Sequence, residues 1–323
     1  MDFLSDLAQA IVSDFTAQGV SFPRYADVDD LASRYFEMRI RRIEPITRTV
    51  HFSEEIHQSL GNLVRGKDPG RSTKAVEAWR TVFYLRHLFE SGEAVLPYLT
   101  DRVNYTEKSD GLLWDYAMHH LHLSRNVGRN GFVERTDWLL FAIVADQDTF
   151  FVDVRPHTDP DRLQWVRQDL LTIVHRNWPE LTASRVLRGV TGDTITDMQK
   201  RELRRKNANL VHNIAGNAIA PLGWGTTADG HSTLCRFLAH KLLHELEQEQ
   251  RILDDHADAL HTVFVEKGMA EEAQPELRLI RKKDLTVSED QVTALSSSEG
   301  LSRDLWHIGF AIVESKTRAL VVV

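Results

Sequence analysis

Residues 115–157 read DYAMHHLHLSRNVGRNGFVERTDWLLFAIVADQDTFFVDVRPH, and this stretch holds three short runs rich in aromatic and branched apolar residues. Runs of this composition favour β-strands. We therefore expect strands at 114–123, 138–144 and 149–154. The polar segment 145–148 is short enough for a tight turn, which predicts that the last two strands form an antiparallel hairpin. Pro156 has no backbone N–H group to donate, so the third strand should end there.

The residues on either side of this stretch are predicted to be mainly helical, with further strands toward the C-terminal end. Apolar residues at helical spacing predict helices at 1–19, 27–42, 53–61, 73–90, 163–178, 194–206 and 232–254. Runs of apolar and branched residues predict additional strands at 46–52, 184–190, 262–265, 276–280, 308–313 and 319–323, and a second hairpin from 208–212 and 218–222. This order predicts an α+β fold, in which a helical N-terminal region precedes a mostly antiparallel sheet with packed helices. We expect three parts, at 1–105, 106–190 and 191–323, with one continuous domain as the alternative.

The composition is that of a globular protein with a buried core: 42% of the 323 residues are hydrophobic and 27% are charged. The net charge of −8 excludes a protein that attracts nucleic acid through overall positive charge, so an RNA-binding chain would need a local basic face. The single cysteine, Cys235, excludes an internal disulfide and is consistent with a reducing compartment. The N-terminus lacks the features of a signal peptide, and no window approaches ~20 apolar residues. We expect a cytoplasmic protein with no membrane contact.

The first predicted strand carries a cluster of histidines. Side chains alternate along a strand, so His120 and His122 share one face, while His119, Leu121 and Leu123 share the other. Because the second face is more apolar, we expect it to meet the core and the His120/His122 face to meet solvent or a groove. Two imidazoles with ordinary pKa values could act there as a general acid and a general base. A polar sheet face without a function is the alternative interpretation.

Basic side chains near this strand are candidates for phosphate binding, because guanidinium groups match the geometry of phosphate. The candidates are Arg135, Arg155 and His157 beside the predicted strands, Arg125 and Arg129 in the loop between the first two strands, and Lys200, Arg204 and Arg205 on a basic predicted helix. In the alternative interpretation these residues have no binding role: the loop arginines belong to an ordinary polar loop, His157 lies at the start of a helix, and the basic helix faces solvent. In the first interpretation the histidines and arginines would perform acid–base chemistry on a phosphodiester.

The order of these segments is similar to that of a known class of ribonuclease. The strand YAMHHLHL, the basic loop with Arg135, the strand WLLFAIV, a tight turn and the strand FFVDVRPH resemble RelE-like and barnase-like ribonuclease toxins over about residues 110–160. The resemblance implies N-terminal helices followed by an antiparallel sheet whose rim cleaves RNA without a metal. It implies that the sheet is lined by His120, His122, Arg135, Arg155 and His157. It further implies an endoribonuclease effector of growth arrest or phage defence that needs no cofactor.

Two other functions remain open from the sequence. A non-catalytic protein could oligomerise, or bind a protein partner, by adding a strand to an exposed sheet edge at 319–323. A metal-dependent hydrolase could use His120, His122 and Asp153, which are metal-capable residue types, although the chain has neither an H-E-x-x-H nor a C-x-x-C motif.

Overall fold

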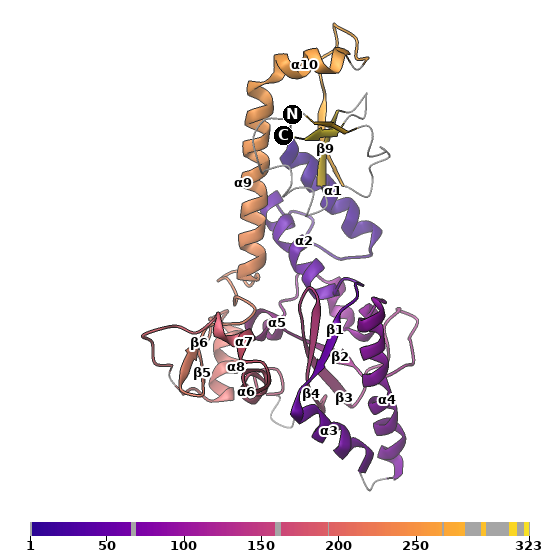
Figure 1. The fold of residues 1–323 in the computed structure, drawn as a ribbon, viewed down its shortest axis with the longest axis vertical. Helices are drawn as coiled ribbons and strands as arrows, with labels where there is room; N and C mark the ends of the chain where they lie inside the picture. The colour runs from indigo at the N-terminus through magenta and orange to yellow at the C-terminus, as the bar shows by residue number, and fades with distance from the viewer. Residues whose placement is uncertain are drawn as a thin grey trace. The chain divides into compact units, whose positions relative to one another are not determined.

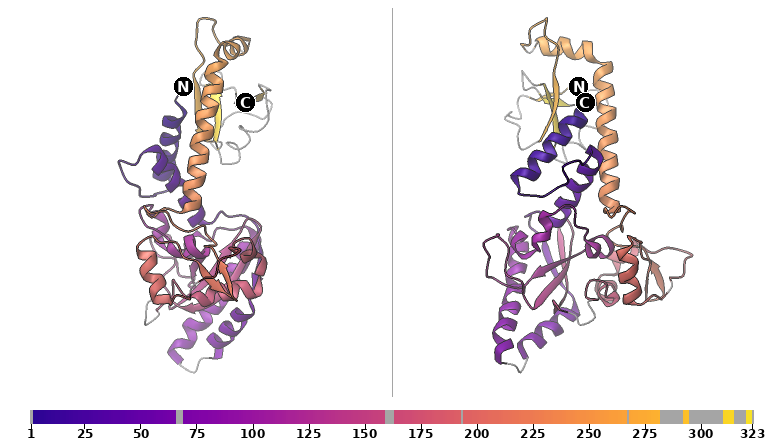
Figure 2. Two further views of the ribbon diagram at one scale, coloured as in Figure 1. Left: turned by 90° about the vertical axis from the view of Figure 1, so that its left-hand side faces the viewer. Right: turned by 180° about the vertical axis from the view of Figure 1, so that it is seen from behind.

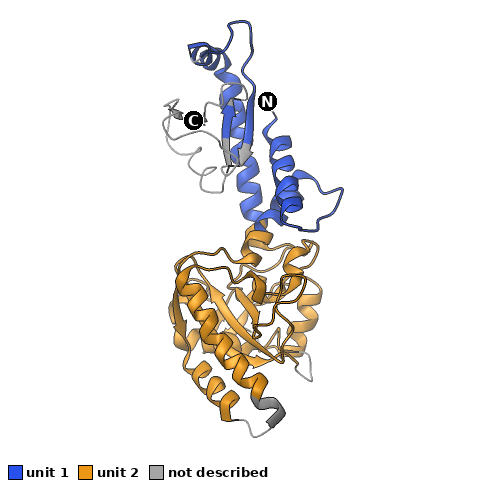
Figure 3. Cartoon of the chain, turned by 90° about the vertical axis from the view of Figure 1, so that its right-hand side faces the viewer, with its two compact units in different colours: residues 1–36, 236–323 blue, residues 37–235 orange. Residues whose placement is uncertain are grey.

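The structure is a computed structural model. It describes residues 2–65, 69–158, 163–192, 194–266, 268–281, 292–294, 310–314 and 320–322 (Figure 1). The chain forms two compact units, one of residues 1–36 with 236–323 and one of residues 37–235 (Figure 3). Helices combine with a mixed sheet in the second unit, so the α+β expectation is confirmed. The unit boundaries fall at 36/37 and 235/236 and differ from the expected boundaries at 105/106 and 190/191.

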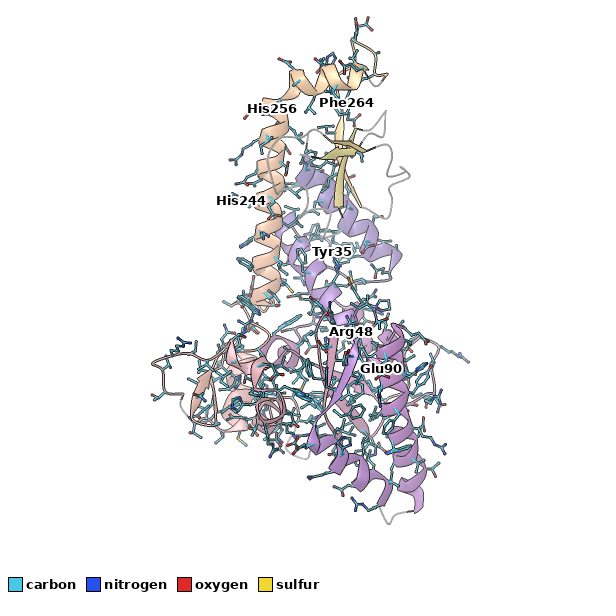
Figure 4. The ribbon with its side chains drawn as sticks, in the orientation of Figure 1. Tyr35, Arg48, Glu90, His244, His256 and Phe264 are labelled. Atoms are coloured by element: carbon cyan, nitrogen blue, oxygen red, sulfur yellow. The ribbon has the colours of Figure 1, made fainter. Side chains whose placement is uncertain are left out.

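The unit of residues 37–235 is built around a four-stranded sheet with the order β1-β4-β3-β2. The strands are β1 (Thr49–Phe52), β2 (Met118–His122), β3 (Trp138–Val144) and β4 (Asp148–Pro156). Strand β1 runs parallel to β4, and the other pairs are antiparallel. The β3–β4 hairpin and the end of β4 at Pro156 are as predicted. Arg48, labelled in Figure 4, donates from Nε to the carbonyl of Ala145 at 2.7 Å, which links the hairpin turn to the segment before β1.

Helices cover both faces of this sheet, as the alternation of its apolar residues requires (Figures 1 and 2). Helices α3 (Glu54–Arg65) and α4 (Pro69–Ser91) cover one face. That face buries Leu121, Leu140, Ala142, Phe151 and Val154. Helix α6 (Gln168–Asn177) packs on the other face. That face buries Met118, Leu139, Phe141, Phe150 and Val152, and alternation along β2 places His120 and His122 on it.

The segment before β2 is a helix where a strand was predicted. Helix α5 (Gly111–Tyr116) begins at Asp110, whose side chain accepts the N–H of Leu113 at 3.1 Å. Ala117 then takes the left-handed conformation with φ 54°, and the strand begins one residue later. A capping carboxylate therefore overrides the strand propensity of the aromatic residues here. Two short helices, η1 (Leu96–Tyr98) and η2 (Asp101–Asn104), precede α5 in the chain.

The rest of this unit contains three small elements. The elements are α7 (Pro179–Ala183), α8 (Asp197–Arg205) and the hairpin of β5 (His212–Ile214) and β6 (Asn217–Ile219). The strand predicted at 184–190 is absent from the described residues of that range, where Val186 forms a single bridge to Ile219. The hairpin is only three residues deep on each side, so it offers too short an edge for a further full strand.

The unit of residues 1–36 with 236–323 combines helices with a second sheet. Its helices include α1 (Phe3–Ala17), most of α9 (Thr233–Asp255), α10 (Ala257–Glu266) and the first part of α2 (Val28–Arg42). The strand predicted at 262–265 is therefore wrong: Leu260 and Phe264, four residues apart, are both buried on one face of α10, and this packing overrides the β-branched residues. Asp6 of α1 accepts the backbone N–H of Leu279 at 2.9 Å.

The second sheet has the order β7-β9-β10-β8. Its strands are β7 (Leu277–Arg281), β8 (Val292–Ala294), β9 (Phe310–Glu314) and β10 (Leu320–Val322). Strand β10 pairs with β9 on one side and with β8 on the other. The prediction that 319–323 forms an exposed sheet edge is therefore wrong for the described residues of that range. Within the part of the chain that the structure describes, no helix has both the length and the apolar character needed to cross a membrane.

Candidate active site

A cavity of about 630 Å³ lies within the unit of residues 37–235, beside the His-bearing face of β2. Three histidines and one tryptophan line it together, and we call this group the imidazole wall: His120, His122, His157 and Trp165. Cationic and acidic side chains line the remainder of the cavity, among them Arg102, Asp110, Arg135, Arg201, Arg204 and Arg205. The cavity thus combines titratable rings with several guanidinium groups.

Three segments of the chain position the imidazole wall. Strand β2 presents His120 and His122 on one face, with ring centroids 6.2 Å apart. The chain leaves β4 directly before His157, whose backbone N–H donates to the carbonyl of Asp137 at 2.7 Å. The His157 ring then lies 5.6 Å from that of His122. The turn before α6 adds Trp165, whose ring lies 4.7 Å from His120 and 6.2 Å from His157.

The histidines are more buried than the sequence indicated. His122 is only 4% exposed, and burial lowers its pKa to about 3, with further lowering by His120, His157 and Arg135. Burial also lowers the pKa of His120, and burial together with Arg135 lowers that of His157. The expectation of solvent-facing rings with ordinary pKa values is therefore wrong, because Trp165 and the neighbouring rings cover this face. The lowered pKa values favour the neutral form of all three imidazoles at neutral pH.

The Nδ1 atom of His122 is an unsatisfied polar atom on this wall. It is buried, and no hydrogen-bond partner for it occurs among the described residues. Buried polar atoms in folded proteins almost always have a partner, whether protein, water or ligand. A neutral imidazole can either donate or accept through such an atom, depending on its tautomer. His122 thus lines the cavity with one ring nitrogen unsatisfied among the described residues.

Arg135 is the guanidinium that belongs most clearly with the wall. It is exposed, it lines the cavity, and its charge lowers the pKa of both His122 and His157. Arg155 lies elsewhere, since its side chain is bound to Asp153 at 2.8 Å and to Asp169 at 2.9 Å and does not line the cavity. The two carboxylates hold this guanidinium away from the cavity, although His157, two residues further along the chain, lines it.

The predicted phosphate-binding residues of the first loop also lie away from the cavity. Arg125 stacks over the ring of Tyr84 at 4.3 Å, and Arg129 is exposed; neither lines the cavity. Lys200 is fully buried, with its amine bound to Gln168 and 3.4 Å from Asp197, so it is inaccessible to a ligand. These three residues follow the alternative interpretation, in which loops and helices carry basic residues for structural reasons.

Helix α8 presents its other basic residues to the cavity. Arg204 and Arg205 both line it, as does Arg201, which was not among the predicted site residues. A capping box at Thr196 fixes the start of α8. Lys200 and Arg204, four residues apart, share the inner side of the helix, where Arg204 reaches both Asp115 and the cavity, and Arg201 and Arg205 share the adjacent side that lines the cavity. The residues missed were Trp165, Gln164, Arg102 and Arg201. Only Arg201 had a signal in the sequence, because it belongs to the basic run at 200–206.

The metal site considered from the sequence is not assembled. Asp153 accepts from the Ser59 hydroxyl at 2.6 Å and from Arg155 at 2.8 Å, and it does not line the cavity with His120 and His122. No group of three or more His, Cys, Asp or Glu side chains suited to a metal occurs among the residues that the structure describes. The positions of these three residues therefore do not support the alternative of a metal site formed by them.

The wall and its arginines can bind an anion and move protons beside it. Neutral imidazoles accept protons, guanidinium groups bind phosphate oxygens, and the face of Trp165 offers a surface for an aromatic ring. Comparisons of the chain with protein-family models, with curated proteins and with solved structures found no match. The functional argument therefore depends on this geometry.

Proposed function

We propose that this cavity cleaves RNA by acid–base catalysis at the His122–His157 pair. Cleavage begins when a base removes the proton from a 2′-hydroxyl and the 2′-oxygen attacks the adjacent phosphorus. The bond from phosphorus to the 5′-oxygen then breaks, and an acid gives that oxygen a proton, which leaves a 2′,3′-cyclic phosphate. The base and the acid must therefore be two groups that reach opposite sides of one phosphorus. The observation that carries this proposal is that the ring centroids of His122 and His157 lie 5.6 Å apart and that Arg135 lines the same cavity.

The charges of the wall indicate how the roles are divided. His122, whose pKa is lowered to about 3, is neutral in the free protein and serves as the base. His157 is less buried, and the causes that lower its pKa are burial and then Arg135. A bound phosphate offsets the charge of Arg135 and so favours protonation of His157, which makes His157 an acid only in the complex. Arg135 then stabilises the negative charge that develops on phosphorus.

Trp165 favours RNA over a small phosphate as the substrate. Proteins that read single-stranded RNA stack unpaired bases on aromatic side chains. Trp165 is half-buried, and its ring lies against His120 and His157, so a base stacked on it would sit next to the reacting phosphate. Together with the resemblance of residues 110–160 to RelE-like and barnase-like toxins, this favours a cytoplasmic ribonuclease effector of growth arrest or phage defence.

The proposal is tested by incubating the purified protein with RNA in excess chelator. We expect the wild type to cleave, and we expect His122→Gln and His157→Gln to lose about 10² to 10⁴-fold in rate, because each removes a proton-transfer group. Glutamine is used because His122 is buried, and alanine would leave a void. His87→Gln is the matched control, since His87 is 66% exposed on α4 beside Glu93. Cleavage that survives both wall substitutions, or that requires an added divalent metal, would overturn the proposal.

A further inference from the structure

The cavity continues toward Thr158 into a second compartment of about 660 Å³. The two compartments overlap: His157 and Trp165 of the imidazole wall line both, and among the described residues that line the second compartment only Thr158 does not also line the first. Three arginines line both compartments, Arg102, Arg201 and Arg205. Trp165 therefore lines both compartments.

The three arginines come from two elements that are far apart in the sequence. Arg102 belongs to the short helix η2 and is exposed. Arg201 and Arg205 lie four residues apart on α8 and so project from the same side of that helix. Glu202 lies near both, 3.5 Å from Arg201 and 3.3 Å from Arg205.

The arrangement of these charges suits a phosphate. Like charges at i,i+4 on a helix repel each other, and an anion between them removes the repulsion. Lys200, the neighbour of Arg201, is buried in the core. The side chains of α8 that line this compartment are therefore those of Arg201 and Arg205. Arginine binds phosphate oxygens in a two-pronged geometry that lysine cannot match.

We propose that the Arg102, Arg201 and Arg205 compartment binds a second phosphate of the RNA chain, next to the one that is cleaved. This inference rests on the proposed function and names its substrate class: a polynucleotide with at least two phosphates, and not a dinucleotide or a cyclic phosphate. Helix α8 supplies two of the three cations and lies outside residues 110–160, so this subsite is an addition to the part of the chain that resembles ribonuclease toxins.

The test compares a dinucleotide with one phosphate and tetranucleotides that extend the same cleavable step at either end. Binding is measured by fluorescence anisotropy on labelled versions with a 2′-deoxy group at that step, and cleavage on the all-ribose versions. We expect the wild type to prefer one of the extended substrates by about 10- to 100-fold. Arg201→Gln/Arg205→Gln should lose this preference, because its affinity for the extended substrate should fall by much more than its affinity for the dinucleotide. The affinity of this variant for the extended substrate should also depend less on salt concentration, by the amount expected for the loss of about one to two phosphate contacts.

Arg129→Gln is the control, because Arg129 is exposed and lies outside both compartments. Equal binding of short and extended substrates by the wild type, or equal losses on both in the double variant, would overturn the subsite. If no substrate is cleaved while the extended one still binds more tightly through the two arginines, the proposed cleavage fails and the subsite stands.

Discussion

Arg204 supports the cavity through contacts with buried groups. Its guanidinium donates to Asp115 from Nε at 3.0 Å and from Nη2 at 2.5 Å, and it also donates to the carbonyl of Trp165. His212, fully buried in its side chain, contacts the other oxygen of Asp115 at 2.7 Å. Burial alone would raise the pKa of Asp115, but His212 and Arg204 outweigh it and hold that pKa below its ordinary value. Arg204 thus fixes the backbone of Trp165.

The buried position of Asp115 predicts a large effect on stability. Asp115→Asn should lower the free energy of unfolding by about 3 to 5 kcal/mol, because it leaves the guanidinium of Arg204 without a charged partner in a buried site. Glu90→Gln is the control (Glu90 is labelled in Figure 4): Glu90 pairs with Arg86 at 2.8 Å on an exposed face of α4, and its loss should cost less than about 1 kcal/mol. Urea unfolding measures both, and similar losses in the two variants would contradict this account.

At the scale of the element, β2 determines which rings meet. Strand alternation places His120 and His122 together and His119 on the opposite face, as the sequence predicted. The same pattern could not show that both faces are covered. His119 is also buried, and burial lowers its pKa to about 4. A strand buried on both faces carries neutral histidines, whichever face they occupy.

The lowered pKa values of the wall predict the pH dependence of cleavage. The profile of kcat/KM reports the free protein, and that of kcat reports the complex. We expect the optimum of kcat/KM below pH ~6.5, the ordinary pKa of histidine, because His122 and His157 both have lowered pKa values. Bound phosphate should move the optimum of kcat to higher pH.

The substitution Arg135→Gln tests in which direction the pH profile of cleavage moves. Arg135 lowers the pKa of His122 and of His157, so its removal should move the kcat/KM profile to higher pH while the rate falls. Arg129→Gln should leave the profile unchanged. A shift toward lower pH in Arg135→Gln, or an optimum of kcat/KM above pH 8 in the wild type, is incompatible with the assigned charges.

For the whole molecule, the buried histidines predict a loss of stability in mild acid. An unfolded chain protonates its histidines as the pH falls through about 6.5, whereas His119 and His122 stay neutral in the folded protein down to about pH 4 and pH 3. The unfolded state therefore binds more protons between pH 7 and 5, and stability falls as the pH falls. Glu249 opposes this trend, because burial and Glu245 raise its pKa to about 7.

Comparison with a variant isolates the histidine contribution. We expect the free energy of unfolding in urea to depend less on pH in His122→Gln than in the wild type between pH 7 and 5. This window lies above the pKa range of ordinary carboxyl groups, and each pKa unit of difference corresponds to about 1.4 kcal/mol. His87→Gln, at an exposed position, should keep the wild-type slope. Equal slopes in His122→Gln and the wild type would show that His122 titrates alike in both states.

The sequence by itself determined the features that depend on neighbouring residues. The β3–β4 hairpin, the end of β4 at Pro156 and the helix start at Ser232 follow from strand propensity, a missing N–H group and a side-chain cap. Local patterns also placed His120 and His122 on one face of β2. The α+β class followed from the order of these elements.

Only the tertiary structure decided which of the candidate residues form a site. The pairing of Arg204 with Asp115 joins residues 89 positions apart, and Trp165 reaches the imidazole wall through a turn that carries no distinguishing pattern. The same holds for the inward turn of Lys200 and for the place of β10 between two strands. Burial sets the pKa of each histidine and the accessibility of each cation, and burial is a property of contacts between distant segments, which local spacing does not encode.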